Sequence, residues 1–209
     1  MFIRLLFAAV FFMIGGAAYA ADSAYSELDF NNGGCKPYGP PPTQEDEDLG
    51  VMALKCAGYK GYVVLYNSGD ERTSVYFGDK DTDTANRGWE SFESFNSIAD
   101  TVEWRLDDAG KPFAAIVRYK VLAEPSDPDA GKPDDVYGQV LVVYRIGQKD
   151  GPEGCAIGLV DAMANKDANV LARKVADEVS KTFACRKDTA IYHGKRGEKA
   201  GGFYAYWGE

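Results

Sequence analysis

The chain has 209 residues, of which 45% are hydrophobic and 26% are charged, with a formal net charge of −9 and one histidine. A chain of this length normally folds as a single domain, and its apolar content is sufficient for an ordinary core. The acidic balance repels nucleic-acid phosphates and anionic lipid headgroups, so we expect neither as a partner. A His-based zinc site is excluded, because catalytic zinc generally takes two or three histidines.

The first twenty residues have the features of a secretory signal peptide. Arg4 gives a positive N-terminal region, residues 5–14 are uninterruptedly apolar, and residues 18–20 read Ala-Tyr-Ala, a small-x-small cleavage site. The alternative is a membrane anchor, but this apolar run is about half of the roughly 20 residues that a spanning helix needs. We therefore expect cleavage between Ala20 and Ala21, a periplasmic or secreted protein, and no transmembrane anchor in the mature chain.

Four cysteines lie beyond this segment, at Cys35, Cys56, Cys155 and Cys185. An even number in an oxidising compartment favours two disulfides, for which three connectivities are possible. We expect Cys35 to pair with Cys56 and Cys155 with Cys185. A strand of about 26 Å from Cys155, followed by a helix of about 27 Å that doubles back, would return Cys185 to its partner. Free thiols or a tetrathiolate zinc site are less favoured, because no CxxC spacing is present.

Composition divides the mature chain into three parts. Residues 21–50 are rich in proline and glycine and contain an acidic cluster, which predicts an irregular N-terminal arm. Residues 51–185 carry the periodic apolar patterns of a single folded domain. Residues 186–209 are rich in glycine, lysine and tyrosine, and we expect them to form a loosely held C-terminal tail.

Strand patterns precede a single helical pattern in this domain. The expected strands are residues 51–56, 62–66, 73–77, 101–106, 113–122, 137–146 and 155–162. Residues 167–184 then predict a helix whose apolar stripe contains Val170, Leu171, Val175, Val179 and Phe183. This order predicts an α+β fold, in which a largely antiparallel sheet of about six or seven strands carries one C-terminal amphipathic helix on a face.

Parts of the chain resemble a group of small exported bacterial proteins with no assigned activity. The resemblance lies in KCAGYKGYVV, SGDERTSVYFG, SFNSIADTVEWRLDDAGKPFAAIVRYKV and VDAMANKDANVLARKVADEVSKTFAC, between Cys56 and Cys185. It implies an exported single domain, and it carries over no catalytic, cofactor or metal residue.

Three groups of residues are catalytic candidates, and none is assigned a catalytic role. His193 lies outside the predicted elements and lacks the sequence signature of a nucleophile beside it. The pairs Glu90 with Glu93 and Asp107 with Asp108 could serve a carboxylate-dependent hydrolase. However, Asp107 and Asp108 fall in a predicted hairpin turn, where aspartate is favoured for backbone reasons alone.

The acidic loop from Asp79 partly matches a calcium-binding loop. Asp79, Asp81, Asp83 and Glu90 occupy its first, third, fifth and twelfth positions. The sixth position is Thr84, where the sharp turn needs glycine. We therefore favour a solvated acidic loop and expect no cofactor.

Four tyrosines, Tyr59, Tyr62, Tyr66 and Tyr76, cluster along the first strands. They could form a contact surface for sugar or protein, although packing on a sheet face is the more ordinary role of tyrosine in strands. Taken with the acidic charge, these features predict a non-catalytic binding or envelope-associated protein whose partner is unknown, with a cationic envelope or secreted protein as one candidate. A carboxylate-dependent cell-wall hydrolase is the alternative.

Overall fold

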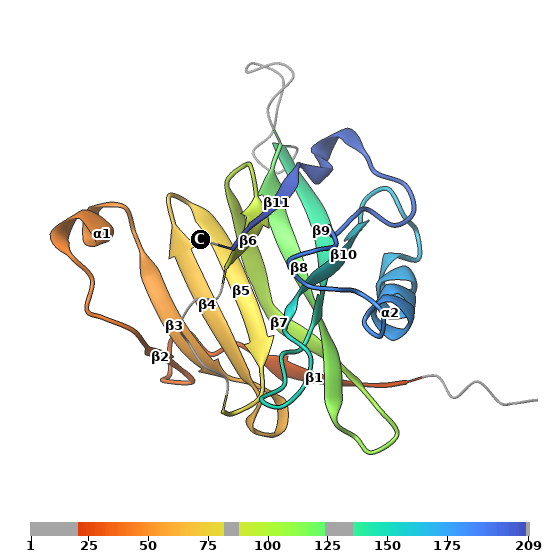
Figure 1. The fold of residues 1–209 in the computed structure, drawn as a ribbon. Helices are drawn as coiled ribbons and strands as arrows, with labels where there is room; N and C mark the ends of the chain where they lie inside the picture. Colours follow the sequence, from red (N-terminus) through yellow and green to blue (C-terminus); the bar gives the residue numbers. More distant parts are fainter. Residues whose placement is uncertain (1–20, 82–87, 124–135, 208–209) are drawn as a thin grey trace, which may run out of the picture.

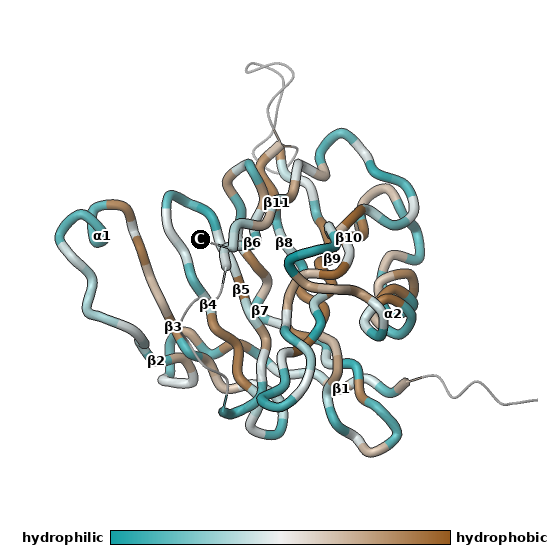
Figure 2. Tube along the Cα trace, in the orientation of Figure 1, coloured by the Kyte–Doolittle hydropathy of each residue, from teal (hydrophilic) through white to brown (hydrophobic). Residues whose placement is uncertain are grey.

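The computed structural model describes residues 21–81, 88–123 and 136–207 (Figure 1). The signal peptide predicted over residues 1–20 lies outside these ranges. Within them, eleven strands form three antiparallel sheets, more than the six or seven strands expected. Figure 2 shows the hydrophobic stretches concentrated in the strands and on one helix, whereas the connecting loops are mostly hydrophilic.

The largest sheet has the strand order β1-β7-β8-β9-β10. Its strands are β1 (Asp22–Glu27), β7 (Asn96–Leu106), β8 (Pro112–Leu122), β9 (Tyr137–Arg145) and β10 (Cys155–Asp161). A four-stranded sheet follows the chain order, with β2 (Cys35–Pro37), β3 (Met52–Ala57), β4 (Val63–Gly69) and β5 (Arg72–Gly78). The third sheet pairs β6 (Trp89–Phe92) with β11 (Phe203–Tyr206).

The main core contains side chains from all three sheets. The Phe77 ring on β5 contacts the rings of Trp104 on β7 and Tyr144 on β9, at centroid distances of 5.5 and 5.1 Å. Side chains alternate between the two faces of a strand. Ile116 on β8 and Leu141 on β9 therefore lie on the face opposite the main core, in a second core beneath the helix. Both faces of the five-stranded sheet are therefore largely buried along β8, β9 and β10, which explains why these strands are apolar on both faces.

The helix α2 (Ala168–Val179) packs against β8, β9 and β10 (Figure 1). It is shorter than the helix expected over residues 167–184, and β11 follows it, so the expectation of a C-terminal helix is wrong. Val175 is 3% exposed, whereas Val170, which the sequence places on the apolar stripe, is 62% exposed. The helix approaches the sheet closely at Gly158, where an added Cβ would lie 2.7 Å from Val175.

The N-terminal segment is not irregular, because it contributes strands to two sheets. β1 pairs with β7 from Asp22 opposite Leu106 to Glu27 opposite Thr101, and β2 pairs with β3. The acidic cluster forms the short helix α1 (Gln44–Asp48), which begins with a capping box between Thr43 and Asp46. The expectation for residues 21–50 is thus wrong, since composition does not reveal partners that lie far along the chain.

The C-terminal segment is likewise held by hydrogen bonds. The His193 N–H donates to the Leu159 carbonyl at 2.8 Å, and the Leu159 N–H donates to the Ile191 carbonyl at 3.0 Å. Farther on, β11 pairs with β6, and Ala200 is buried in the main core. The expectation of a loosely held tail is therefore wrong for residues 186–207.

Candidate functional site

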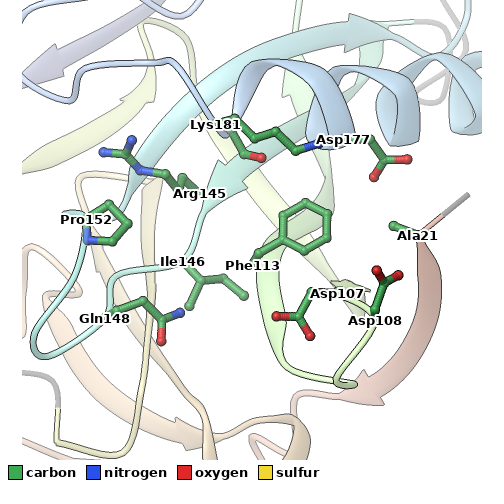
Figure 3. A pocket seen from close by; sticks show the side chains of 11 residues that line it. Ala21, Asp107, Asp108, Phe113, Arg145, Ile146, Gln148, Pro152, Asp177 and Lys181 are labelled. Carbon is green, nitrogen blue, oxygen red and sulfur yellow. The ribbon is translucent and has the colours of Figure 1, made fainter. Parts of the chain in front are cut away.

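An open cavity of about 650 Å³ lies between the β7–β8 turn, the segment after β9 and the end of α2 (Figure 3). This volume is within the range of roughly 300 to 1,000 Å³ that is typical of ligand pockets. Its charged residues are Asp107, Asp108, Asp177, Arg145 and Lys181, and its apolar lining includes Phe113, Ile146 and Pro152. The cavity therefore offers both charge signs around an apolar floor.

The β7–β8 turn supplies two of the acids. The Asp107 carboxylate accepts hydrogen bonds from the backbone N–H groups of Ala109 at 3.0 Å and Lys111 at 2.8 Å, which holds the turn together. Asp108 is exposed and has no hydrogen bond or ion pair with any residue that the structure describes. Of this pair, only Asp108 therefore has a carboxylate that is not engaged in the turn.

The third acid, Asp177 on α2, is fixed by Arg105 on β7. Arg105 Nε donates to Asp177 Oδ1 at 2.9 Å and Nη2 donates to Oδ2 at 2.7 Å, a bidentate ion pair. Beside it, Arg173 on α2 pairs with Glu103 on β7 at 2.6 Å. Ser23 on β1 joins the two pairs, because its hydroxyl donates to Glu103 and accepts from Arg105.

The basic side of the cavity is formed by Arg145 and Lys181. Arg145 donates to the carbonyl oxygens of Glu153 and Phe183 and to Cys185 Sγ, and burial lowers the pKa of its guanidinium. Lys181 extends along α2 toward Asp177 (Figure 3). The guanidinium of Arg145 thus ties β9 to the segment after α2, and Lys181 is the more adaptable of the two cations.

Both predicted disulfides are confirmed. Cys35 and Cys56 are bonded and lie opposite each other in the β2–β3 pair. Cys155 at the start of β10 is bonded to Cys185, beyond α2, as the return of the helix requires. Since Arg145 contacts Cys185, the second disulfide also supports one wall of the cavity.

The structure separates Glu90 from Glu93. Glu90 on β6 is 5% exposed, and both carboxyl oxygens lie within hydrogen-bonding distance of the Ala156 N–H, at 3.0 and 2.9 Å. Burial raises the pKa of Glu90 to about 8. The Glu93 carboxylate lies instead beside Gly202, where an added Cβ would meet it. This pair therefore does not form a shared catalytic site.

The residues that partly match a calcium-binding loop do not converge within the described residues. The Asp79 carboxylate accepts hydrogen bonds from the N–H groups of Asp81 and Lys149, whereas Glu90 points to Ala156 in the interior. Asp83 lies outside the described ranges. Across residues 21–81, 88–123 and 136–207, no cluster of three histidine, cysteine or acidic residues is suited to holding a metal ion.

His193 and the four tyrosines, the remaining candidate residues, pack against other parts of the fold. His193 is partly buried beside Gly158, and burial lowers the pKa of its imidazole. Tyr59, Tyr62 and Tyr66 pack against the main core, whereas Tyr76 is buried with Val63 and Leu65 in a smaller cluster. These contacts favour packing over a contact surface for the four tyrosines.

Sequence reasoning missed Arg145, Asp177 and Lys181 as parts of one site. Arg145 ends an apolar strand, and Asp177 belongs to the polar face of α2. Charged residues at such positions are ordinary, so no local signal sets them apart. Only the packing of α2 against the sheet brings them to the turn that carries Asp108.

Comparison with known proteins gives no match to a family model, a curated protein or a solved structure. In the part of the chain that the structure describes, no helix has both the length and the apolar character needed to cross a membrane. The functional proposal therefore rests on the geometry and charge of the cavity.

Proposed function

We propose that this is an exported, disulfide-stabilised binding protein whose cavity receives a lysine or arginine side chain from a cationic protein or peptide. Export is supported by the signal-like sequence of residues 1–20 and by two disulfides, which persist in oxidising compartments. The net charge of −9 favours encounter with cationic partners. An N-terminus at Ala21, measured by mass spectrometry of the native protein, would support export; an intact Met1 would contradict it.

The observation that carries the proposal is the unpaired carboxylate of Asp108 at this cavity. Asp107 is held by the turn through Oδ1, and Asp177 is paired with Arg105, so both acids are fixed in place and add negative charge to the cavity. Asp108 has no such partner among the described residues. A ligand cation would therefore meet Asp108 with two more acids beside it, and it would share Asp108 with the α-amino group that cleavage creates at Ala21, which lines the same cavity (Figure 3).

The apolar floor fits the stem of a long cationic side chain. Lysine and arginine bury their methylene groups along apolar surfaces while the charged end remains near water. Phe113 extends into the cavity between the acidic and basic walls (Figure 3). A stem packed on Phe113 would direct its charge to Asp108, and Arg145 and Lys181 on the opposite wall would oppose the reverse orientation.

The carboxylate-dependent hydrolase has less support. Glycosidases position one protonated and one ionised carboxyl group about 5 to 9 Å apart around a cleft. In this cavity, Asp107 and Asp177 are committed to structural hydrogen bonds, and the protonated carboxyl of Glu90 lines a different cavity. Because Asp107 and Asp177 hold the structure together, the large cavity favours a binding role over a catalytic one.

A charge-matched pair of variants tests the site. The chain beginning at Ala21 is titrated calorimetrically with trilysine at low salt, as wild type, Asp108→Asn and Glu47→Gln. Glu47 is exposed on α1, so Glu47→Gln removes the same charge at a position away from the cavity. An ion pair of about 1 kcal/mol predicts that Asp108→Asn weakens binding about fivefold. Equal effects of both variants would show that only net charge matters, and absence of binding would reject the proposal.

A further inference from the structure

A second, smaller cavity of about 250 Å³ lies where β6 and β11 meet the start of β10. Its lining includes Glu90, the backbone of Cys155 and Ala156, and the segment that follows α2. The apolar part of the lining is formed by Ala156, Phe183, Ala190, Phe203 and Trp207. This cavity is separate from the site proposed above, and its lining includes the carboxyl group of Glu90, a residue that is 5% exposed.

The carboxyl group of Glu90 has no basic partner within the described residues. Its recorded hydrogen-bond donor is the Ala156 N–H, which lies near both oxygens. A buried carboxylate without a counterion is costly, so the neutral acid is the favoured form at neutral pH. The raised pKa of Glu90, about 8, agrees with this state.

A neutral carboxyl group has an O–H that must donate to an acceptor. Among the described residues, the Glu90 carboxyl group has a hydrogen bond with the Ala156 N–H alone, and the hydroxyls of Tyr119 and Tyr144 bond to each other at 2.9 Å. Glu90 and Ala156 both line the cavity. An acceptor atom of a ligand in the cavity would complete this hydrogen bond.

The mouth of the cavity favours an anion. Arg186 and Lys187 line it, and Arg186 lies over the Trp207 ring at 5.3 Å while it pairs with Glu153. Asp188 also lines the cavity, but its carboxylate accepts the Ala184 N–H at 2.7 Å. Lys187 is therefore the cation that is available to an entering ligand.

We infer that this cavity binds a small monocarboxylate with an apolar body, whose carboxylate accepts the Glu90 proton and approaches Lys187. The neutral acid and the anion form one charge-assisted hydrogen bond, and no covalent step is needed. The apolar body lies against Phe183, Phe203 and Trp207. The small volume, below the usual range for drug-sized ligands, limits the body to about one ring or a short alkyl chain.

Binding should weaken as Glu90 ionises. Above about pH 8 the Glu90 carboxylate would face the ligand carboxylate, and like charges repel. The other titratable or charged groups around Glu90 and its cavity are Tyr119, Tyr144, Glu153, Arg186, Lys187, Asp188 and Tyr204. Burial raises the pKa of Tyr119 and Tyr144 well above this range, so they remain neutral as Glu90 titrates.

Calorimetric titration with sodium benzoate at pH 6.5 and pH 9.5 tests the inference. We expect saturable binding at pH 6.5 and at least about tenfold weaker binding at pH 9.5. Glu90→Gln, which keeps a neutral donor, should bind with little dependence on pH, whereas Glu90→Leu should lose binding. Lys187→Ala changes an exposed residue and should weaken binding without unfolding the protein.

Benzyl alcohol serves as the uncharged control and should bind more weakly than benzoate at pH 6.5. Equal benzoate binding by wild type, Glu90→Leu and Lys187→Ala would overturn the inference, as would no saturable binding at millimolar concentrations. Asp108→Asn should leave benzoate binding unchanged. The outcome therefore does not depend on whether the larger cavity binds cations.

Discussion

Arg105 and Asp177 connect the five-stranded sheet to α2 through two nearly parallel hydrogen bonds of 2.9 and 2.7 Å. Arg105 is almost fully buried in β7, whereas Asp177 is partly exposed at the large cavity. The neighbouring pair, Glu103 with Arg173, has the opposite polarity, with the acid on the strand and the base on the helix. This reciprocal arrangement fixes the position of α2 along the sheet and hence one wall of the cavity.

We expect Asp177→Ala to lower the free energy of unfolding by about 2 kcal/mol, because it leaves the buried guanidinium of Arg105 without its charged partner. Lys174→Ala, on the exposed side of the same helix, should change it by less than about 0.5 kcal/mol. Urea unfolding at low and high salt measures both. A coupling energy near zero in the double-mutant cycle with Arg105→Ala would contradict a stabilising role for the pair.

Two valines of α2 provide a matched test of its packing. Val175→Ala should cost about 2 kcal/mol, because it removes methyl groups from the core between α2 and β10. Val170→Ala makes the same chemical change at a 62% exposed position and should cost less than about 0.5 kcal/mol. The two variants are compared by denaturant unfolding with disulfides intact. Similar costs would mean that the buried face of the helix has been placed incorrectly.

Removal of the Cys155–Cys185 disulfide should lower stability by about 3 to 4 kcal/mol, because the bond closes a loop with a sequence separation of 30. The double variant Cys155→Ala/Cys185→Ala is compared with wild type by unfolding without reductant. Peptide mapping of the wild type should find Cys155 linked to Cys185 and no free thiol. A Cys56–Cys155 link would contradict the fold.

Glu90 should make stability depend on pH with a defined sign. Its folded-state pKa is about 8 and its ordinary value is 4.5, so the folded state holds more protons between these two pH values. The contribution of Glu90 to the free energy of unfolding is therefore most favourable near and below pH 4.5. It falls as pH rises toward 8, by up to about 1.4 kcal/mol per pH unit.

The comparison of wild type with Glu90→Gln isolates this contribution. The variant should gain stability relative to wild type as pH rises from 5 to 8, measured by urea unfolding at each pH. Glu47→Gln on α1 is the control and should follow the wild type. A constant difference between wild type and Glu90→Gln across this range would contradict a neutral, buried Glu90.

Local patterns in the sequence were sufficient for several features of the fold. The alternation of apolar residues identified the long strands β7, β8 and β9, since side chains of a strand alternate between its faces whatever its partner. The Cys155–Cys185 pair also followed from the lengths of the predicted strand and helix, whereas no such geometry was available for Cys35 and Cys56. β1, β2, β6 and β11 were not predicted. β1 and β11 each pair with a strand distant in sequence and lack a strong pattern of their own.

The sequence by itself determined the acidic charge, the signal-like N-terminus, the antiparallel strands and the two disulfides, because composition and short-range periodicity carry these properties. Only the tertiary structure decided which charged groups are available. Asp107 and Asp108 are neighbours of the same type, yet backbone hydrogen bonds engage one and leave the other free. Glu90 is one acid among many in the sequence, and its proton affinity arises from burial between strands that the chain brings together only on folding.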